Sequence, residues 1–119
     1  MKKFLAVFTG SKDGDNAQRW QALSEEERQR LMGEGMQAWG AWMAKHSDAV
    51  VDAGGPLGIT KLVDGAGVSD INNAMSAYIM VQAEDHAAAA AMFIDHPHFR
   101  CFPGDGVEVM ECMPMPGGQ

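Results

Sequence analysis

Two segments of this 119-residue chain are apolar at nearly every consecutive position, and they constrain the fold more than any other feature. In Lys3–Thr9, the run Phe4–Phe8 places apolar side chains on both faces of a predicted strand, because successive strand residues point to opposite sides. The second predicted strand, Ala74–Ala83, has the run Tyr78–Val81 at its centre. Strands of this kind need cover on both faces. The sequence therefore predicts a sheet with helices on one face and a further layer on the other.

A long helix is predicted between these strands. Ser24 and Glu27 form an S-x-x-E capping box, and the acidic run Glu25–Glu27 suits the positive end of a helix dipole. The helix is expected to end near Lys45-His46, where basic side chains suit its negative end. Residues spaced by three or four positions form one face, namely Met32, Met36, Trp39, Met43 and His46. Interior glycines indicate either close packing against another backbone or a weakened helix, at Gly33, Gly35 and Gly40.

The remaining predicted elements complete a β-α-β-hairpin-β-α-β order. They are a loop at Gly10–Asn16, a strand at Ala49–Ala53, a turn at Gly54–Gly58, and a hairpin of Ile59–Val63 and Ala66–Val68 around Asp64-Gly65. A helix at Ala87–Ile94 capped by Asp85, a turn at Gly104-Asp105-Gly106 and a strand at Val107–Cys112 follow. This order predicts an α+β fold of the ferredoxin-like βαββαβ type with an inserted hairpin. One domain of residues 1–119 is expected, with an irregular tail at Met113–Gln119. A second copy of the chain is the simplest cover for the open sheet face, so we expect a homodimer.

Charge and composition narrow the expected partners. The formal net charge is -7, and an acidic chain repels phosphate backbones, so no nucleic-acid partner is expected. No window approaches the roughly 18–20 apolar residues of a membrane span, and Phe4–Phe8 is too short for a signal peptide. Two cysteines, Cys101 and Cys112, do not make a disulfide framework. These features predict a cytoplasmic protein with no membrane partner.

The cluster His96-Pro97-His98 is the main candidate for chemistry. Histidine titrates near neutral pH, so His98 can act as a general acid or base, with Asp95 or Asp70 as the orienting carboxylate. In the structural alternative, the cluster only satisfies helix-end groups and a backbone carbonyl. No metal site and no cofactor are predicted, because the chain lacks H-x-x-x-H and any cysteine pair at metal spacing. Candidate ligand-binding residues, which would equally suit a core, are Tyr78, Trp39, Met36 and His96.

Several segments together resemble the YCII-related family, also called the DGPF group. They are Lys2-Lys3-Phe4-Leu5, the capped helix with Trp39 and Trp42, the turn Asp52–Gly58, Asp95-His96-Pro97-His98-Phe99, and Val107–Glu111. The resemblance covers almost the whole chain. It implies a ferredoxin-like fold that pairs as a dimeric α+β barrel. For some relatives it also implies acid–base chemistry on small lactone-type metabolites, carried out by a histidine and an aspartate in a cleft.

The chain departs from the pattern of this family in two places. The relatives carry their histidine inside the long helix, whereas here the only histidine on that helix is His46, at its end. The family aspartate corresponds to Asp64 or Asp70, and the DGPF tetrapeptide is replaced by Asp64-Gly65-Ala66-Gly67. We therefore expect a homodimer that binds a small organic metabolite in a cleft, with one of two roles. It carries out cofactor-independent acid–base chemistry of a lyase, isomerase or dehalogenase type at His98, or it is a non-catalytic ligand-binding or regulatory module.

Overall fold

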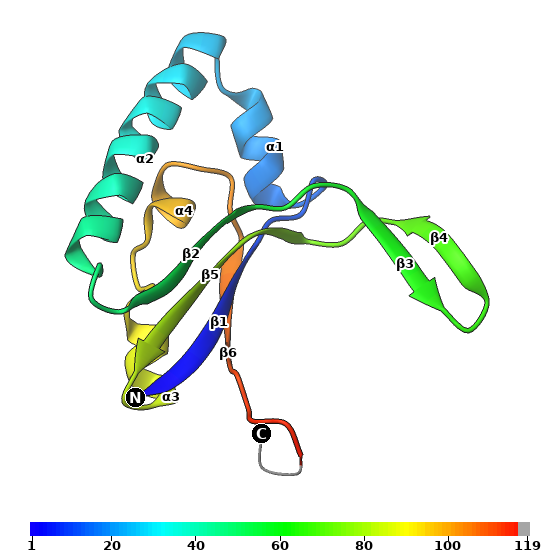
Figure 1. Cartoon of the computed structure of the whole chain (residues 1–119). Helices are drawn as coiled ribbons and strands as arrows, with labels where there is room; N and C mark the ends of the chain where they lie inside the picture. Colours follow the sequence, from blue (N-terminus) through cyan, green and yellow to red (C-terminus); the bar gives the residue numbers. More distant parts are fainter. Residues whose placement is uncertain (117–119) are drawn as a thin grey trace.

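The computed structural model describes residues 1–116, and for Arg100 the backbone only. Its elements, shown in Figure 1, are β1 (Lys2–Thr9), α1 (Asp15–Ala22), α2 (Glu25–Lys45), β2 (Val50–Pro56), β3 (Thr60–Asp64), β4 (Gly67–Ile71), β5 (Met75–Ala83), α3 (His86–Ala91), α4 (Pro97–Arg100) and β6 (Gly106–Glu111). This mixture confirms the predicted α+β class. Within residues 1–116, no helix is both long and apolar enough to cross a membrane.

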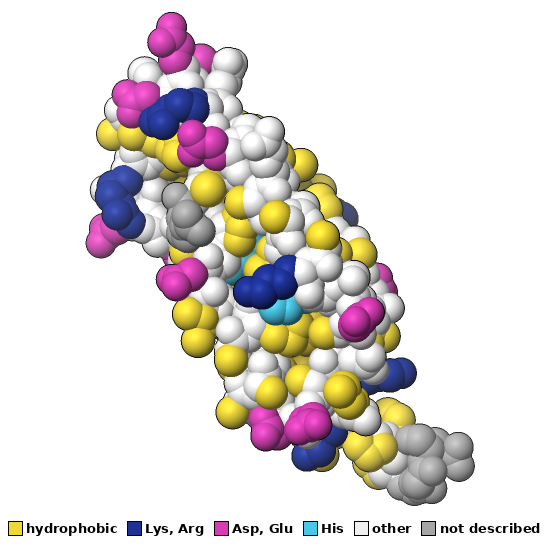
Figure 2. Space-filling model, turned by 90° about the vertical axis from the view of Figure 1, so that its left-hand side faces the viewer, with side chains coloured by type: hydrophobic (Ala, Val, Ile, Leu, Met, Phe, Trp, Pro, Cys, Tyr) yellow, Lys and Arg dark blue, Asp and Glu magenta, His cyan; other side chains and the backbone are white. Residues whose placement is uncertain are grey.

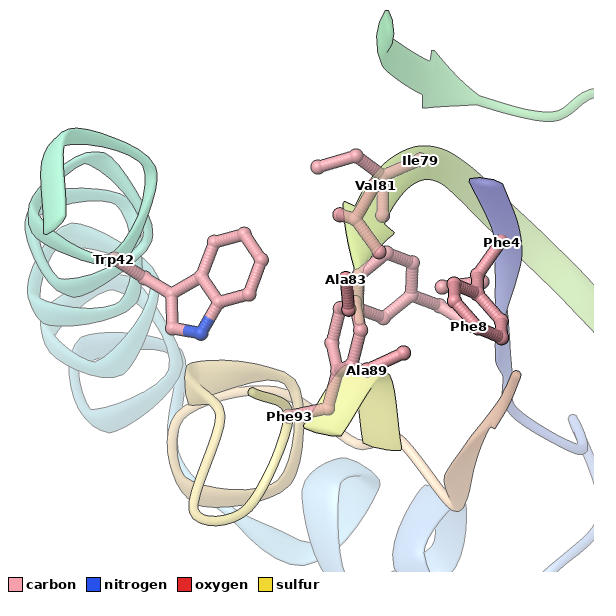
Figure 3. Close-up of a cluster of buried hydrophobic side chains, with 9 residues drawn as sticks. Phe4, Phe8, Trp42, Ile79, Val81, Ala83, Ala89 and Phe93 are labelled. Atoms are coloured by element: carbon pink, nitrogen blue, oxygen red, sulfur yellow. The ribbon is translucent and has the colours of Figure 1, made fainter. Parts of the chain in front are cut away.

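Four strands form an antiparallel sheet in the order β2-β5-β1-β6. In its register, Phe4 lies opposite Val81 and Ala6 opposite Ile79, so these side chains share one face. The helices pack on that face, where Trp42 of α2 points toward the strands (Figure 3). Phe4, Ala6 and Val81 are fully buried there. The two predicted apolar strands are therefore confirmed, and their helix-covered face is the core.

The opposite face of the sheet lies outside the buried core cluster. By the same register it carries Leu5 and Val7 of β1, Tyr78 and Met80 of β5, and Glu108 and Met110 of β6. Val7 is 7% exposed and Met110 is 42% exposed. The second layer that the sequence requires is thus not supplied by the core helices.

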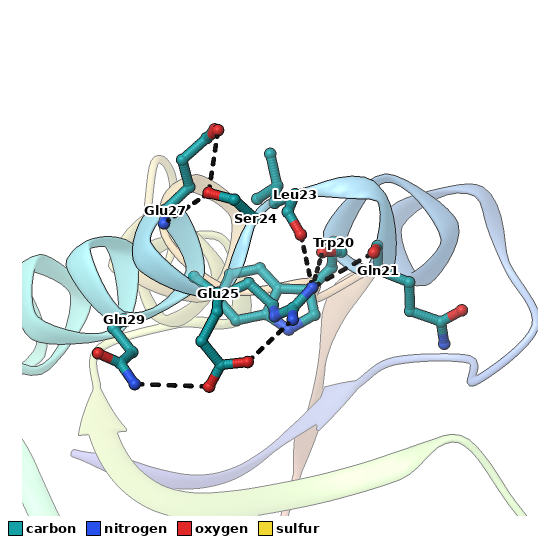
Figure 4. Close-up of polar contacts among 8 residues, drawn as sticks. Trp20, Gln21, Leu23, Ser24, Glu25, Glu27 and Gln29 are labelled. Atoms are coloured by element: carbon teal, nitrogen blue, oxygen red, sulfur yellow. Dashed lines mark hydrogen bonds and ion pairs between the residues drawn. The ribbon is translucent and has the colours of Figure 1, made fainter.

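The start of α2 follows the prediction, and the segment before it does not. Ser24 Oγ accepts a hydrogen bond from the backbone N–H of Glu27 at 3.2 Å, as expected for the cap. The predicted loop at Gly10–Asn16 runs into an unpredicted helix, α1. The Arg28 guanidinium holds the end of α1 by donating to the carbonyl oxygens of Trp20, Gln21 and Leu23, contacts drawn in Figure 4. This helix depends on a side chain from the next element, which a local pattern does not reveal.

The C-terminal third differs from the prediction in its helices. Asp85 caps α3 as expected, with its carboxylate accepting from Ala88 N at 2.8 Å, but the helix ends at Ala91, short of the predicted Ile94. Asp95 follows in the left-handed region, with φ of 58°. The short helix α4 begins at Pro97 and was not predicted. Residues 113–116 of the predicted irregular tail contain no helix or strand, and 117–119 lie outside the described residues.

The predicted hairpin is present and projects from the sheet. Its strands β3 and β4 pair from Thr60–Ile71 to Asp64–Gly67, leaving Gly65-Ala66 as the turn. It forms a separate two-stranded sheet, drawn at the right of Figure 1. The radius of gyration is 16.4 Å, against about 13.5 Å for a compact domain of this length. The projecting hairpin contributes to this difference.

Candidate active site

A cavity of about 390 Å³ lies between α2 and the helix-covered face of the sheet. Its walls are mostly apolar and aromatic, with contributions from Phe8, Met36, Trp39, Ile79, His98 and Phe102. Figure 2 shows the side of the molecule that carries α2, where histidine side chains are visible among apolar ones. A mostly apolar hollow with few polar groups is typical of a small-molecule site.

His98 is a titratable residue on the wall of this cavity. It is the second residue of α4 and is 7% exposed. Its Nε2 atom lies 2.8 Å from the carbonyl oxygen of Thr9 on β1. Because a carbonyl oxygen only accepts, Nε2 of the neutral ring carries the proton and Nδ1 keeps the lone pair. Within the described residues, Nδ1 has no hydrogen-bond partner.

Burial and three neighbours set the proton affinity of His98. Desolvation lowers its pKa, because the charged ring loses water on burial. The Thr9 carbonyl, the Asp105 carboxylate and the backbone of Gly106 act in the opposite direction and partly offset this effect. The net pKa lies below its ordinary value of 6.5. At neutral pH the ring is therefore a base with an available lone pair.

Gly104 makes room for the His98 ring. A Cβ atom built at Gly104 would lie 2.3 Å from His98 Nε2 and 2.4 Å from Cδ2 and Cε1. Any side chain at this position would displace the ring from the Thr9 carbonyl. The prediction treated Gly104-Asp105-Gly106 only as a turn and also missed Phe8 and Phe102 as cavity residues. Gly104 is required by the ring of His98, six positions earlier, and such a requirement leaves no periodic pattern in the sequence.

His96 lies behind the cavity wall. It is fully buried, and its ring centroid is 4.5 Å from that of Trp39 and 4.8 Å from that of Trp42. Its Nδ1 accepts the backbone N–H of His98 at 3.0 Å, so Nε2 carries the proton of the neutral ring and has no partner among the described residues. Burial, with smaller effects from His98 and His46, lowers its pKa to about 4. His96 thus fixes the backbone at His98 and stays neutral.

The structure brings together some of the predicted site residues. Met36, Trp39 and His98 border one cavity, and Tyr78 also contributes to its wall. The register pairs Tyr78 with Val7, however, which places its side chain on the open face of the sheet. A contact between its hydroxyl and a ligand stays a prediction.

The two predicted aspartates lie on the hairpin and are engaged there. Asp70 forms an ion pair with Lys61, with an Nζ–Oδ1 distance of 2.6 Å. Asp64 accepts the backbone N–H of Ala66 at 2.9 Å. Neither borders the cavity of its own chain. In the described part of the molecule, no group of three or more His, Cys, Asp or Glu side chains is arranged to hold a metal ion.

Comparison with known proteins adds a fold but no family. No family model and no curated protein matches the chain. A solved structure that it resembles is 5-chloro-2-hydroxyhydroquinone dehydrochlorinase (TftG) from Burkholderia phenoliruptrix AC1100, in complex with 2,5-dihydroxybenzoquinone. The match has a TM-score of 0.53 and 14% sequence identity, and it covers 98% of this chain and 99% of that chain. The likeness therefore extends over the whole described fold.

Proposed function

We propose that the chain binds a small, planar organic molecule between α2 and the sheet, and that His98 exchanges a proton with it. The observation that carries this proposal is the His98 ring, held through Nε2 by the Thr9 carbonyl, on the wall of an apolar cavity of about 390 Å³. That volume is near the lower end of the usual range for ligand pockets, which favours a compact, single-ring molecule. The rings of Phe8, Trp39 and Phe102 suit the faces of such a ligand.

The reaction class that suits this arrangement begins with proton abstraction. A neutral imidazole removes a proton from a weakly acidic O–H or C–H of the ligand, and the resulting imidazolium can return it elsewhere. Elimination and isomerisation both follow this scheme without a cofactor. The dehydrochlorinase with the similar fold acts on a hydroxylated ring compound and binds a quinone. This supports hydroxylated rings and quinones as the first ligands to test.

The finer architecture is part of the same proposal. The sheet order β2-β5-β1-β6, with a helical connection on each side of the hairpin, supports a ferredoxin-like fold of the YCII-related type. The open face supports a homodimer in which a second copy covers Tyr78 and Met80, as in a dimeric α+β barrel. In that assembly, the projecting hairpin of the second copy is the route by which Asp64 or Asp70 would approach a cleft. A mass of one chain in analytical ultracentrifugation at micromolar concentration would overturn the dimer.

The binding proposal is tested by calorimetric titration with 2,5-dihydroxybenzoquinone and a panel of hydroxylated quinones and lactones. We expect His98→Asn to weaken binding about tenfold, the effect of losing one good hydrogen bond. His86→Asn is a matched control, because His86 Nε2 also lies 2.7 Å from a backbone carbonyl, that of Val109, but away from the cavity. Equal affinities of wild type and His98→Asn for every bound compound would contradict a His98-centred site.

A non-catalytic binding module is the second candidate. It is favoured by the cavity wall itself, which is largely apolar and has no carboxylate among its lining residues. Turnover separates the two. Ultraviolet spectra of bound panel compounds would change with time in an enzyme, at a rate that His98→Asn abolishes. Stable spectra with unchanged ligands would assign the cavity to binding alone.

A further inference from the structure

One carbonyl oxygen in the structure accepts two hydrogen bonds that belong to different parts of the chain. The Thr9 oxygen, at the end of β1, accepts from His98 Nε2 at 2.8 Å and from the backbone N–H of Asp105 at 2.9 Å. The position of this oxygen decides which nitrogen of His98 carries the proton. Whatever fixes Thr9 relative to the loop before β6 therefore also fixes the proton of His98.

Asp105 provides that link through its side chain as well. Its Oδ2 accepts the backbone N–H of Ser11 at 2.7 Å, and its Oδ1 accepts Asn16 Nδ2 at 2.9 Å. Asn16 Nδ2 also donates to the Gly104 oxygen at 3.2 Å. The carboxylate thus ties both ends of the Ser11–Asn16 segment, one residue after Thr9, to the loop whose Gly104 contacts the His98 ring. The pKa of Asp105 is lowered by these two hydrogen bonds, so the group is an anion at neutral pH.

Besides Asp105, the described groups that raise the pKa of His98 are the backbone groups of Thr9 and Gly106, and no second anion is among them. α2 faces it with the apolar ring of Trp39, and β1 faces it with Phe8 and the Thr9 carbonyl. His96, two residues earlier, has a pKa of about 4 and is neutral at neutral pH. Among the described side chains that affect the charge of His98, Asp105 is the anion.

We propose that Asp105 is a positioning residue that locks His98 in the Nε2–H form and leaves Nδ1 as the basic nitrogen. The proton position on His98 follows from contacts within the chain, whatever the cavity binds, and this part goes beyond the proposed function. The use of Nδ1 in catalysis rests on the proposed function, because it requires that the proposed ligand contacts Nδ1.

The proposal is tested by nitrogen-15 NMR of the histidine rings in the full-length protein without ligand. In the wild type we expect His98 to be mainly Nε2–H above its pKa, with a preference of about tenfold from one hydrogen bond. Asp105→Asn removes the negative charge. It also replaces the carboxylate that accepts from Asn16 Nδ2 with a second amide, which weakens that hydrogen bond. We expect the His98 pKa to fall and the preference for Nε2–H to shrink.

Two further variants separate charge from position. Asp13→Asn, the control, removes a carboxylate from the same segment that has no side-chain hydrogen bond among the described residues, and it should leave both readouts unchanged. Asn16→Ala keeps the Asp105 charge but removes the hydrogen bond from Asn16 to its carboxylate, so it should reduce the Nε2–H preference of His98 with little change in the His98 pKa. This variant also replaces Asp105→Asn if Asp105→Asn fails to fold. Identical His98 spectra in Asp13→Asn, Asp105→Asn and Asn16→Ala would overturn the proposal. Failure of every ligand to bind would contradict the proposed function and leave these spectra unaffected.

Discussion

The helix-covered face of the sheet and the β3–β4 hairpin are both rich in large apolar side chains, but they bury them to very different extents. On the covered face, Phe4 and Val81 are 0% exposed. On the hairpin, Val63 is 71% exposed and Val68 67%, and Ile59, directly before β3, is 97% exposed. The same residue types therefore stabilise one region and stay open to a partner in the other.

Because of this difference in burial, we expect the covered face of the sheet and the hairpin not to unfold as one cooperative unit. An isolated two-stranded hairpin is marginally stable in water, because it has no third layer on which to bury its side chains. The β3–β4 hairpin pairs only with itself in the described residues. If a second copy of the chain covers the hairpin, as proposed, the stability of the hairpin depends on that copy, whereas the stability of the covered face does not.

The largest effect on the free energy of unfolding is expected at a fully buried core residue. Phe4→Ala removes a fully buried ring from the core and should lower the free energy of unfolding by about 3–5 kcal/mol, the usual effect of deleting a core aromatic side chain. Val68→Ala on the hairpin should change it by less than about 0.5 kcal/mol in a single chain. Urea unfolding followed by circular dichroism measures both.

Protein concentration makes the same pair of variants more informative. If a second copy covers the hairpin, the loss in Val68→Ala grows with protein concentration, while that in Phe4→Ala does not. Equal losses in the two variants at low concentration would show that the hairpin belongs to the same cooperative unit as the core.

The next largest effect concerns the buried histidines on the covered side. The pKa of His96 is about 4 when folded, against about 6.5 when unfolded, so the unfolded chain binds more protons between these values. Stability is therefore complete above pH 6.5 and falls as the pH drops toward 4. Up to about 3 kcal/mol should be lost in this window. The lowered pKa of His98 adds a loss of the same sign.

Urea unfolding at pH 7.5, 6.0 and 4.5 measures this loss above the range in which Asp105 is protonated. His96→Asn, which keeps an acceptor for the His98 backbone N–H, should show a clearly shallower dependence on pH. His86→Asn is the control, because His86 is exposed, and it should keep the wild-type slope. Parallel curves for His96→Asn and the wild type would refute the assignment of this loss to His96.

The sequence was most informative where the decisive contacts are local. Ser24 and Asp85 cap their helices through neighbours three residues away, and both caps were predicted correctly. The predicted face of α2 is only partly correct: Trp39 and Met43 pack against the core, but Met32 and Met36 are exposed. The buried Trp42 lies outside that predicted face. In contrast, α1 is held by Arg28 of the following helix, and α4 is a short turn around His98. Such elements depend on tertiary contacts, which residue spacing does not encode.

The candidate site was predictable in part for the same reason. His98 was identified by its chemistry, since histidine next to a helix end is a common acid or base. Its acceptor, Thr9, is 89 positions away, and no pattern in the sequence connects the two. The carboxylate that acts on His98 in the structure is Asp105, which the prediction treated as part of a turn. This segment was therefore predicted only as a turn, although Gly104 also makes room for the His98 ring.

The smallest effects on the free energy of unfolding are expected at two glycines of α2, one packed against neighbouring side chains and one not. A Cβ at Gly35 would lie 2.5 Å from the Phe102 ring and 2.8 Å from Cys101 Cβ, so close packing explains this glycine. Gly40 has nothing within 4 Å among the described residues. Gly35→Ala should therefore lower the free energy of unfolding by about 1–3 kcal/mol through overpacking. Gly40→Ala should raise it by up to about 1 kcal/mol through helix propensity, as measured by urea unfolding. A destabilising Gly40→Ala would mean that a second copy packs against this face of α2, and that outcome should then weaken as the protein is diluted.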